Sequence, residues 1–270
     1  MAAPTSRNRE VVVLGESEVG PDVAVTPAVE PRELSALEAL AGESIPLLLY
    51  SLVYLLYLFA TLEGEAGHWV TLVALPFLMV LLLRRARGKP TGIAALGAAV
   101  GLRRGRLTTG LGIAAGVGLA LAALQLMVSR SRAQILEALT STSALYLLPL
   151  AFVLLLLTAA FTEEFFFRGI LLTRLRARWG ALPALLVSSF LFGLYHLPYA
   201  YLHPRWPSHG DWAAALSAAM SQGGLAGLIL GGVYIIARGN LLAPVLVHAL
   251  INLPPLLAML PGMVHFGAKG

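Results

Sequence analysis

Long apolar runs separated by short polar segments dominate the chain from Ile45 onward. A helix needs about 20 predominantly apolar residues to cross the hydrocarbon core of a bilayer. By that measure we place seven spans, at residues 45–62, 68–83, 108–128, 145–173, 182–202, 213–236 and 241–260. The apolar segment 92–102 is short and rich in Gly and Ala, so we expect it to lie at the interface or to re-enter, unless it hides an eighth crossing. The pattern predicts an all-α, polytopic transmembrane helix bundle of about seven to eight spans.

The composition supports a membrane protein and excludes several kinds of site. Hydrophobic residues make up 58% of the chain, charged residues 12%, and the mean hydropathy is +0.79, which is far from the values of soluble domains. Because the chain has no cysteine, disulfides, thiolate metal sites and cysteine nucleophiles are excluded.

The charge is divided unevenly between the N-terminal segment and the rest. Residues 1–44 carry eight acidic and three basic residues, a net charge of −5, so the overall +5 leaves +10 for residues 45–270. Residues 1–44 are also rich in Pro, Glu, Val and Ser, which predicts a mostly disordered tail, with a short interfacial helix at 32–40 as an alternative. Residues 45–270 form the predicted membrane domain.

Arginine placement predicts the orientation in the membrane. Most basic residues fall on one side of the bundle, in segments 84–89, 103–106 and 174–178 and at Arg238; the other side has only three arginines. Because cytoplasmic loops are enriched in Lys and Arg, we expect these segments and the N-terminus in the cytoplasm. We take the basic residues as topology determinants rather than contacts for nucleic acid. The lipid bilayer is the implied partner, and seventeen arginines against two lysines suggest a bacterial inner membrane.

Tryptophans and glycines have structural interpretations. The four tryptophans lie at the ends of predicted spans, where such rings anchor a helix at the interface: Trp69, Trp179, Trp206 and Trp212. Glycines repeat at intervals of four, which lets helix backbones approach closely, in two series: Gly223, Gly227 and Gly231, and Gly112 and Gly116.

The stretch 161–170, F-T-E-E-F-F-F-R-G-I, places three charged residues inside an apolar run. A charge at the bilayer centre costs about 2.5–3.5 kcal/mol on insertion scales, so such residues are candidates for function. On a helix Glu164 and Arg168 are neighbours at i,i+4 and can pair, whereas Glu163 points about 100° away. We expect one glutamate to be structural and the other to carry chemistry.

Two later spans carry further polar residues at helical spacing. Phe192 and His196 stand at i,i+4, and so do His248 and Asn252. Counted from the cytoplasmic helix ends at 1.5 Å per residue, Glu163 lies about 16 Å deep, His196 about 22 Å and His248 about 12 Å. The sequence therefore predicts one polar catalytic cavity inside the bundle, open to water on the cytoplasmic side.

These residues resemble the glutamic intramembrane endopeptidases of the CPBP family, which includes CAAX prenyl proteases and bacteriocin-processing proteins. The resemblance rests on three motifs in order, Glu163-Glu164-Phe-Phe-Phe-Arg168, Phe192-Gly-Leu-Tyr-His196 and His248-Ala-Leu-Ile-Asn252. It covers residues 145–260, and the first half of the chain carries no motif.

The resemblance implies the residues of an active site. The catalytic residues would be Glu163, His196, His248 and Asn252, supported by Glu164 and Arg168. The first glutamate and the first histidine would activate a water, and the second histidine and the asparagine would lie on the oxyanion side. The implied activity is hydrolysis of a peptide bond in a membrane-associated protein or peptide, with no metal and no cofactor.

Three alternatives from other classes stay open. A zinc hydrolase could use Glu163, His196 and His248 as ligands, although no H-E-x-x-H pair is present and Arg168 disfavours a dication. A transporter could use buried acids as a proton relay, although no inverted repeat is evident. A non-catalytic scaffold or immunity protein is the third. If the chain is a bacterial protease, we expect an unprenylated peptide or membrane segment as substrate, near the cytoplasmic face.

Overall fold

The computed structural model describes residues 31–102, 107–140 and 144–267, and every regular element in these ranges is a helix. The first elements are α1 (Pro31–Thr61), α2 (Glu65–His68), the π-helix η1 (Trp69–Ala74), α3 (Leu75–Ala86), α4 (Ile93–Ala99), α5 (Leu107–Val128) and α6 (Arg132–Thr140). The later ones are α7 (Ala144–Leu155), η2 (Leu156–Ala160), α8 (Phe161–Glu164), η3 (Phe165–Leu172), α9 (Thr173–Trp179), α10 (Ala181–Leu202), α11 (Trp212–Ala218), η4 (Ala219–Gly224), α12 (Leu225–Ile236) and α13 (Leu242–Gly267). The predicted all-α class is confirmed.

Within the residues that the structure describes, six helical stretches are long and apolar enough to cross a membrane. They are Ala41–Thr61, Ala66–Ala86, Gly110–Val128, Leu148–Trp179, Ala181–Leu202 and Trp212–Ile236, and a shorter apolar stretch, Leu242–Ala258, lies at the predicted seventh span. The segment suspected of an eighth crossing forms only the short helix α4, followed by a turn, so it does not span. The chain is a multi-pass membrane protein.

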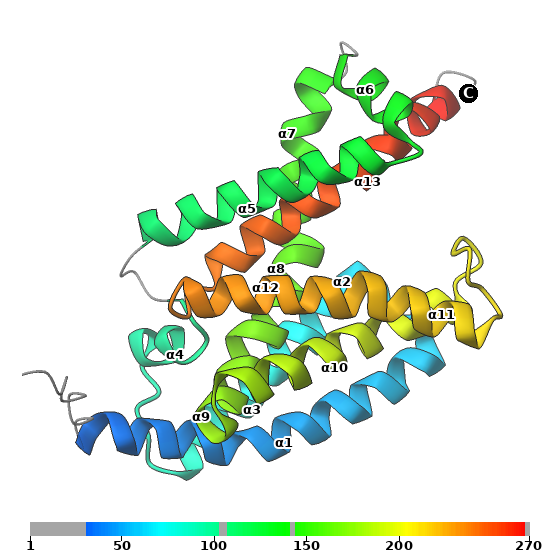
Figure 1. Cartoon of the computed structure of the whole chain (residues 1–270). Helices are drawn as coiled ribbons and strands as arrows, with labels where there is room; N and C mark the ends of the chain where they lie inside the picture. Colours follow the sequence, from blue (N-terminus) through cyan, green and yellow to red (C-terminus); the bar gives the residue numbers. More distant parts are fainter. Residues whose placement is uncertain (1–30, 103–106, 141–143, 268–270) are drawn as a thin grey trace, which may run out of the picture.

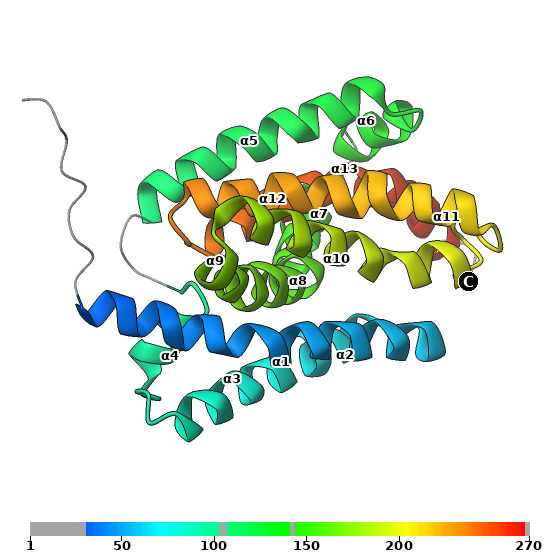
Figure 2. The ribbon, with the colours of Figure 1, turned by 60° about the horizontal axis from the view of Figure 1, so that its bottom comes forward.

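The helices form two groups joined by a central one (Figures 1 and 2). Helix α13 packs along α5, and together they form one side of the molecule; α10 packs against η4 and α12, and α1 packs against α9 on the other side. The continuous run from α7 through η2, α8 and η3 to α9 passes between these groups. Because it contacts helices of both groups, residues near its middle lie in the centre of the bundle.

Local sequence determines where two of these helices begin. Gly180 has a positive φ of 82°, which residues with a side chain rarely adopt. This turn at Gly180 allows α10 to start directly after α9 and run back antiparallel to it. At the start of α11 the Asp211 carboxylate accepts hydrogen bonds from the backbone N–H groups of Ala213 and Ala214, at 2.9 and 3.0 Å. This is a side-chain N-cap, which satisfies donors that the first turn leaves open.

The first helix starts earlier than the sequence predicted. The boundary between tail and membrane domain was placed at residue 44, but α1 begins at Pro31. Residues 1–30, which make up most of the predicted disordered tail, lie outside the described residues. Near the middle of α1, Glu43 is fully buried and pairs with Arg174 of α9 at 2.9 Å.

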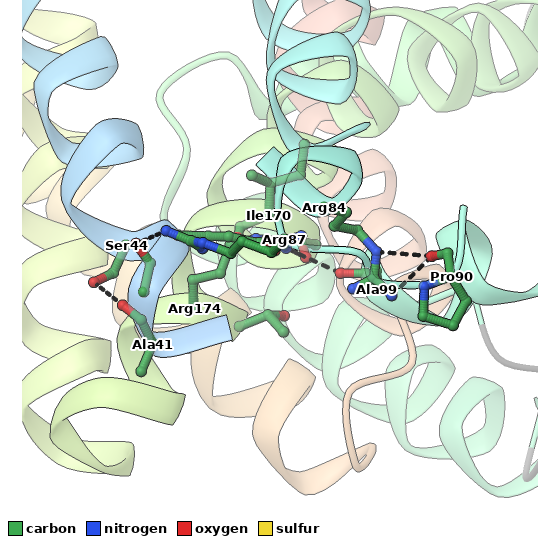
Figure 3. Close-up of polar contacts among 12 residues, drawn as sticks. Ala41, Ser44, Arg84, Arg87, Pro90, Ala99, Ile170 and Arg174 are labelled. Carbon is green, nitrogen blue, oxygen red and sulfur yellow. Dashed lines mark hydrogen bonds and ion pairs between the residues drawn. The ribbon is translucent and has the colours of Figure 1, made fainter. Parts of the chain in front are cut away.

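Arg174 is a core residue, although the sequence analysis counted it among the loop arginines. Its guanidinium donates to the carbonyl oxygens of Ala99 (2.9 Å) and Ile170 (3.2 Å) in addition to Glu43 (Figure 3). The sequence analysis ended this span at residue 173, but the helix continues through α9 to Trp179. Arg174 therefore lies within the helical run and not in a loop. Nearby Arg87 donates to the carbonyl of Gly42 at 3.1 Å, so α1, α4, α9 and the end of α3 are joined at this end of the bundle.

The glycine series on the sixth span has the predicted packing role. A Cβ atom on Gly227 would lie 2.9 Å from the Cα of Ser189, and one on Gly223 would lie 3.1 Å from the Cα of Gly193, both in α10. The first separation is shorter than real Cβ contacts and the second is tighter than most of them, so the bare backbones of η4 and α12 allow this close approach to α10.

The second glycine series does not pack, and that prediction is wrong. A Cβ on Gly112 or Gly116 would meet no described atom within 4 Å. The packed face of α5 is carried instead by Gly110, the fully buried Ala114 and Gly118, where an added Cβ would contact Asn240 or Leu250. Both sets repeat at intervals of four, so the spacing identified a helical stripe but not the side of the helix that faces α13.

We expect Gly227→Ala to destabilise the bundle, because its Cβ would press on the backbone of α10. Overpacking of this kind typically costs roughly 1–3 kcal/mol, which thermal unfolding in detergent, followed by circular dichroism, would detect as a lowered midpoint. Gly232→Ala is the matched control on the same helix, since its Cβ would meet no atom within 4 Å. An equal loss in both variants would contradict the packing assignment.

Candidate active site

The helix that carries the two adjacent glutamates is irregular on both sides of them. The predicted span 145–173 is interrupted by the π-helices η2 before and η3 after the single α-helical turn α8, and Thr158 in η2 departs from helical geometry, with φ −96° and ψ −105°. Short π-helical segments occur frequently at functional sites. Here Glu163 and Glu164 are both buried, at 6% and 0% exposure.

Glu164 is held by two basic side chains. Its Oε1 atom lies 2.9 Å from Nη1 of Arg168 and 2.8 Å from Nδ1 of His248. The pair with Arg168 is the one that i,i+4 spacing predicted. The contact with His248 joins α8 to α13, far apart in the sequence, and no spacing rule could have indicated it. Glu164 therefore both neutralises a buried arginine and orients a histidine.

Arg168 is buried and is contacted from several directions. It is 1% exposed, donates to the Gly227 carbonyl at 3.2 Å, and its guanidinium carbon lies 4.2 Å above the ring of Phe192. A cation over an aromatic face gains more when it is desolvated. The side chain thus links η3 to α12 and α10 and fixes the walls around the glutamates.

Glu163 has a different environment, as the sequence analysis expected. Its Oε1 accepts a hydrogen bond from the Tyr195 hydroxyl at 3.3 Å, and its Oε2 lies 3.9 Å from Nε2 of His248. Within the described ranges, Oε2 is buried and has no hydrogen-bond partner. The same is true of Oε2 of Glu164, but of the two glutamates only Glu163 lines the cavities described below.

His196 is oriented by its own helix. Its Nδ1 lies 2.8 Å from the Phe192 carbonyl oxygen, which can only accept, so Nδ1 carries the proton. In the neutral ring Nε2 is then an acceptor. The Phe192 ring also meets His196 edge to face, with centroids 4.8 Å apart. The predicted i,i+4 pair of these residues is present, and its function is to hold the imidazole.

One cavity of about 580 Å³ brings the four predicted catalytic residues together. Glu163, His196, His248 and Asn252 all line it. The rest of its wall is largely apolar and comes from α5, α12 and α13: Leu121, Leu124, Leu225, Ile229 and Ile251. Counting residues placed Glu163, His196 and His248 within one middle slab, and the tertiary structure turns their faces, with that of Asn252, toward one space.

A second cavity, of about 390 Å³, shares Glu163 and His196 with the first and is lined by more polar groups. Its wall includes His203, after the end of α10, and residues 62–64, after the end of α1. These turns lie at the opposite end of the helices from the arginine-rich segments, whereas the sequence analysis expected the cavity to open on the arginine-rich side. Counting residues gives depth along a helix, but it does not show which end of a cavity is closed by packing.

The structure adds residues that sequence reasoning passed over. Trp206, taken for an interface anchor, lines both cavities. Gln125 lines the larger cavity, and as an amide within the apolar run of α5 it could have been noticed as an isolated polar residue in a span. Tyr195 touches Glu163, and its place beside His196 was the available signal.

The geometry does not favour the zinc alternative. Across the described part of the chain, no three or more His, Asp or Glu side chains are arranged so that they could hold a metal ion. Oε1 of Glu164 accepts a hydrogen bond from Arg168 and also contacts Nδ1 of His248, so this nitrogen of His248 is engaged by Glu164.

We expect Arg168→Ala to be strongly destabilising, because it leaves Glu164 buried with one partner fewer. Breaking a buried ion pair typically costs roughly 3–5 kcal/mol. Glu163→Gln should instead keep near-normal stability, since Glu163 has no cationic partner comparable to that of Glu164. Thermal unfolding of both variants, with exposed Arg176→Ala as the control arginine, tests this. Equal destabilisation by Glu163→Gln and Arg168→Ala would mean that the two carboxylates are not distinct.

The comparisons with known proteins agree with the motifs. A family model described as type II CAAX prenyl endopeptidase, Rce1-like, matches residues 145–254, which include the whole set of predicted site residues. No curated protein and no solved structure matches the chain. Residues 145–254 are thus similar to the Rce1-like CAAX endopeptidases, and the resemblance to CPBP-type membrane proteases that the motifs indicated is confirmed.

Proposed function

We propose that this protein is an intramembrane endopeptidase in which Glu163 activates the attacking water. The observation that carries the proposal is that Glu163, whose Oε2 has no partner among the described residues, lines a cavity together with His196, His248 and Asn252, whereas Glu164 does not line it. The neighbouring carboxylate is committed to Arg168, so proton transfer falls to Glu163. The family match supports the class of reaction.

The reaction follows from these positions. A water oxygen attacks the scissile carbonyl carbon while its proton passes to Oε2 of Glu163. His196 accepts a hydrogen bond from the same water through Nε2, which the Phe192 carbonyl leaves as the acceptor nitrogen. When the tetrahedral intermediate collapses, the C–N bond breaks and the proton moves from Glu163 to the leaving amine. General-base assistance of this kind contributes typically 10²- to 10⁴-fold.

His248 and Asn252 are proposed to stabilise the oxyanion. Nδ1 of His248 is directed to Glu164, which turns Nε2 toward Glu163 and the cavity. The protonated ring would donate from both nitrogens, and the Asn252 amide lies one helical turn away on the same wall. A donor aimed at a developing negative charge in a water-poor site contributes more than it would in water.

The cavity also indicates the substrate class. Its volume of about 580 Å³ falls in the range of small-ligand sites, and its leucine and isoleucine lining suits aliphatic side chains or a lipid next to the scissile bond. The residues that form this wall come from α5, α12 and α13, so the substrate would contact both helix groups. We therefore propose a membrane-associated protein or peptide with an apolar segment at the cleavage site.

Cleavage can be measured with the protein in liposomes and two quenched-fluorescent peptides of one CAAX-like sequence, one farnesylated at cysteine and one not. We expect hydrolysis of at least one of the two peptides, and a rate lowered by roughly 10²- to 10⁴-fold in Glu163→Gln.

Asn252→Ala should reduce kcat by roughly 10²- to 10³-fold with little change in KM. A strong chelator should leave the rate unchanged; loss that zinc restores would favour the zinc hydrolase.

The same variants can be compared in cells if neither peptide is cleaved. Membrane proteins and secreted peptides of cells with wild-type protein or Glu163→Ala would be compared for a species that changes length. Absence of such a species, together with uncleaved peptides, would contradict the proposed function.

For orientation we propose that the arginine-rich segments face the cytoplasm, which puts the polar cavity near the outer face. Because the natural chain has no cysteine, single cysteines at Ser6, Thr91 and His209 can report on this with an impermeant thiol reagent in intact cells. His209 is exposed, whereas the neighbouring Ser208 is buried and bonded to the Ala200 carbonyl. Only position 209 should react from outside, and labelling at 6 or 91 would reverse the orientation.

A further inference from the structure

A buried chain of hydrogen bonds leads from Glu163 into the part of the protein that the family match does not cover. His68, in α2, is 4% exposed, and its Nε2 lies 3.2 Å from the Tyr195 hydroxyl oxygen and 3.0 Å from that of Tyr199. Tyr195 in turn lies 3.3 Å from Oε1 of Glu163. The chain therefore joins α2, α10 and α8 inside the smaller cavity.

The donors and acceptors in this chain determine its direction. The Tyr199 hydroxyl lies 2.8 Å from the backbone carbonyl of Glu63, which can only accept, so its proton is used there. The single proton of Tyr195 is used by the Glu163 carboxylate in the same way. For both contacts of His68 to be hydrogen bonds, Nε2 must be the donor. The chain then runs from Nε2–H of His68 to Tyr195 and from Tyr195 to Oε1 of Glu163.

The position of His68 is itself fixed by its surroundings. Glu63, in the turn before α2, accepts hydrogen bonds at Oε2 from Thr71 (2.7 Å) and Tyr54 (3.0 Å), while its carbonyl accepts from Tyr199. The cluster thus ties the turn after α1 to η1 and α10. Because the Tyr199 hydroxyl also contacts Nε2 of His68, this cluster holds the imidazole beside Tyr195.

We propose that Tyr195 and His68 are positioning residues, which hold Oε1 of Glu163 and thereby present Oε2 to the water and to His248. This inference rests on the proposed role of Glu163 as the base. Tyr195 fixes the rotation of the carboxylate, and His68 orders the tyrosine hydroxyl so that its proton points at Oε1. Neither residue lines the larger, apolar cavity. Their loss should therefore lower kcat more than it changes KM.

The size of the effect follows from geometry. Misplacement of a reacting group by about 1 Å can cost roughly 10²-fold in rate. We expect Tyr195→Phe, which removes one oxygen atom and keeps the ring, to reduce kcat by about 10- to 100-fold. His68→Ala should have a similar effect, and His68→Gln should restore part of the rate, since its amide can donate from nearly the position of Nε2.

Tyr201→Phe is the matched control. Tyr201 lies on the same helix as Tyr195, but its ring stacks on Trp212 with centroids 3.9 Å apart, away from Glu163. The Tyr201→Phe variant should cleave the farnesylated or unlipidated peptide at the wild-type rate. In the Glu163→Gln background, Tyr195→Phe should cause no further loss, because a residue that acts through Glu163 has nothing left to position. An additional loss there would indicate a separate structural role and would overturn the proposal.

A readout without turnover separates this inference from the proposed function. The infrared difference between wild type and Glu163→Gln isolates the carboxyl bands of Glu163. These bands should shift in Tyr195→Phe and His68→Ala but not in Tyr201→Phe; unchanged bands in the first two would overturn the inference, whether or not a peptide is cleaved. If Glu163→Gln cleaves like wild type, the proposed function fails. If Glu163→Gln is inactive and Tyr195→Phe is as active as Tyr201→Phe, only the positioning role fails.

Discussion

The neutralisation of one buried carboxylate is the constraint on which the centre of this protein depends. Two adjacent glutamates in an apolar bundle would repel each other and lose their hydration, so at least one needs a cation in direct contact. Arg168 supplies it for Glu164 at 2.9 Å, and the arginine in turn requires the Gly227 carbonyl and the Phe192 ring. These contacts bring α12 and α10 against the central helix.

That arrangement explains how neighbours in sequence can have different roles. Glu164 also orients His248, so a single carboxylate oxygen arranges a cation and an imidazole from two helices. Glu163, one residue away, lines the cavity that also carries Asn252. The fixed position of Glu164 thus determines the geometry in which Glu163 could react.

Sequence patterns identified elements and pairs within a helix, because periodicity relates residues on one element. The pair of Glu164 with Arg168, the pair of Phe192 with His196 and the helical class could all be predicted in this way. Contacts between helices could not, since they depend on how each helix is rotated about its axis. The Gly112 stripe shows this, because the packed stripe of α5 begins two residues earlier, at Gly110. The end of the helices at which the polar cavity lies and the contact of Glu164 with His248 could not be predicted for the same reason.

The two cavities that meet at Glu163 and His196 have a consequence for what happens after a bond is broken. One is walled mainly by aliphatic side chains, and the other by tyrosines, histidines and a glutamate near a helix end. If hydrolysis takes place between them, an apolar fragment and a charged fragment would each have a cavity of matching polarity to leave through. Water would then enter through the polar cavity while an apolar product still occupies the aliphatic cavity, so turnover would not require the whole bundle to open.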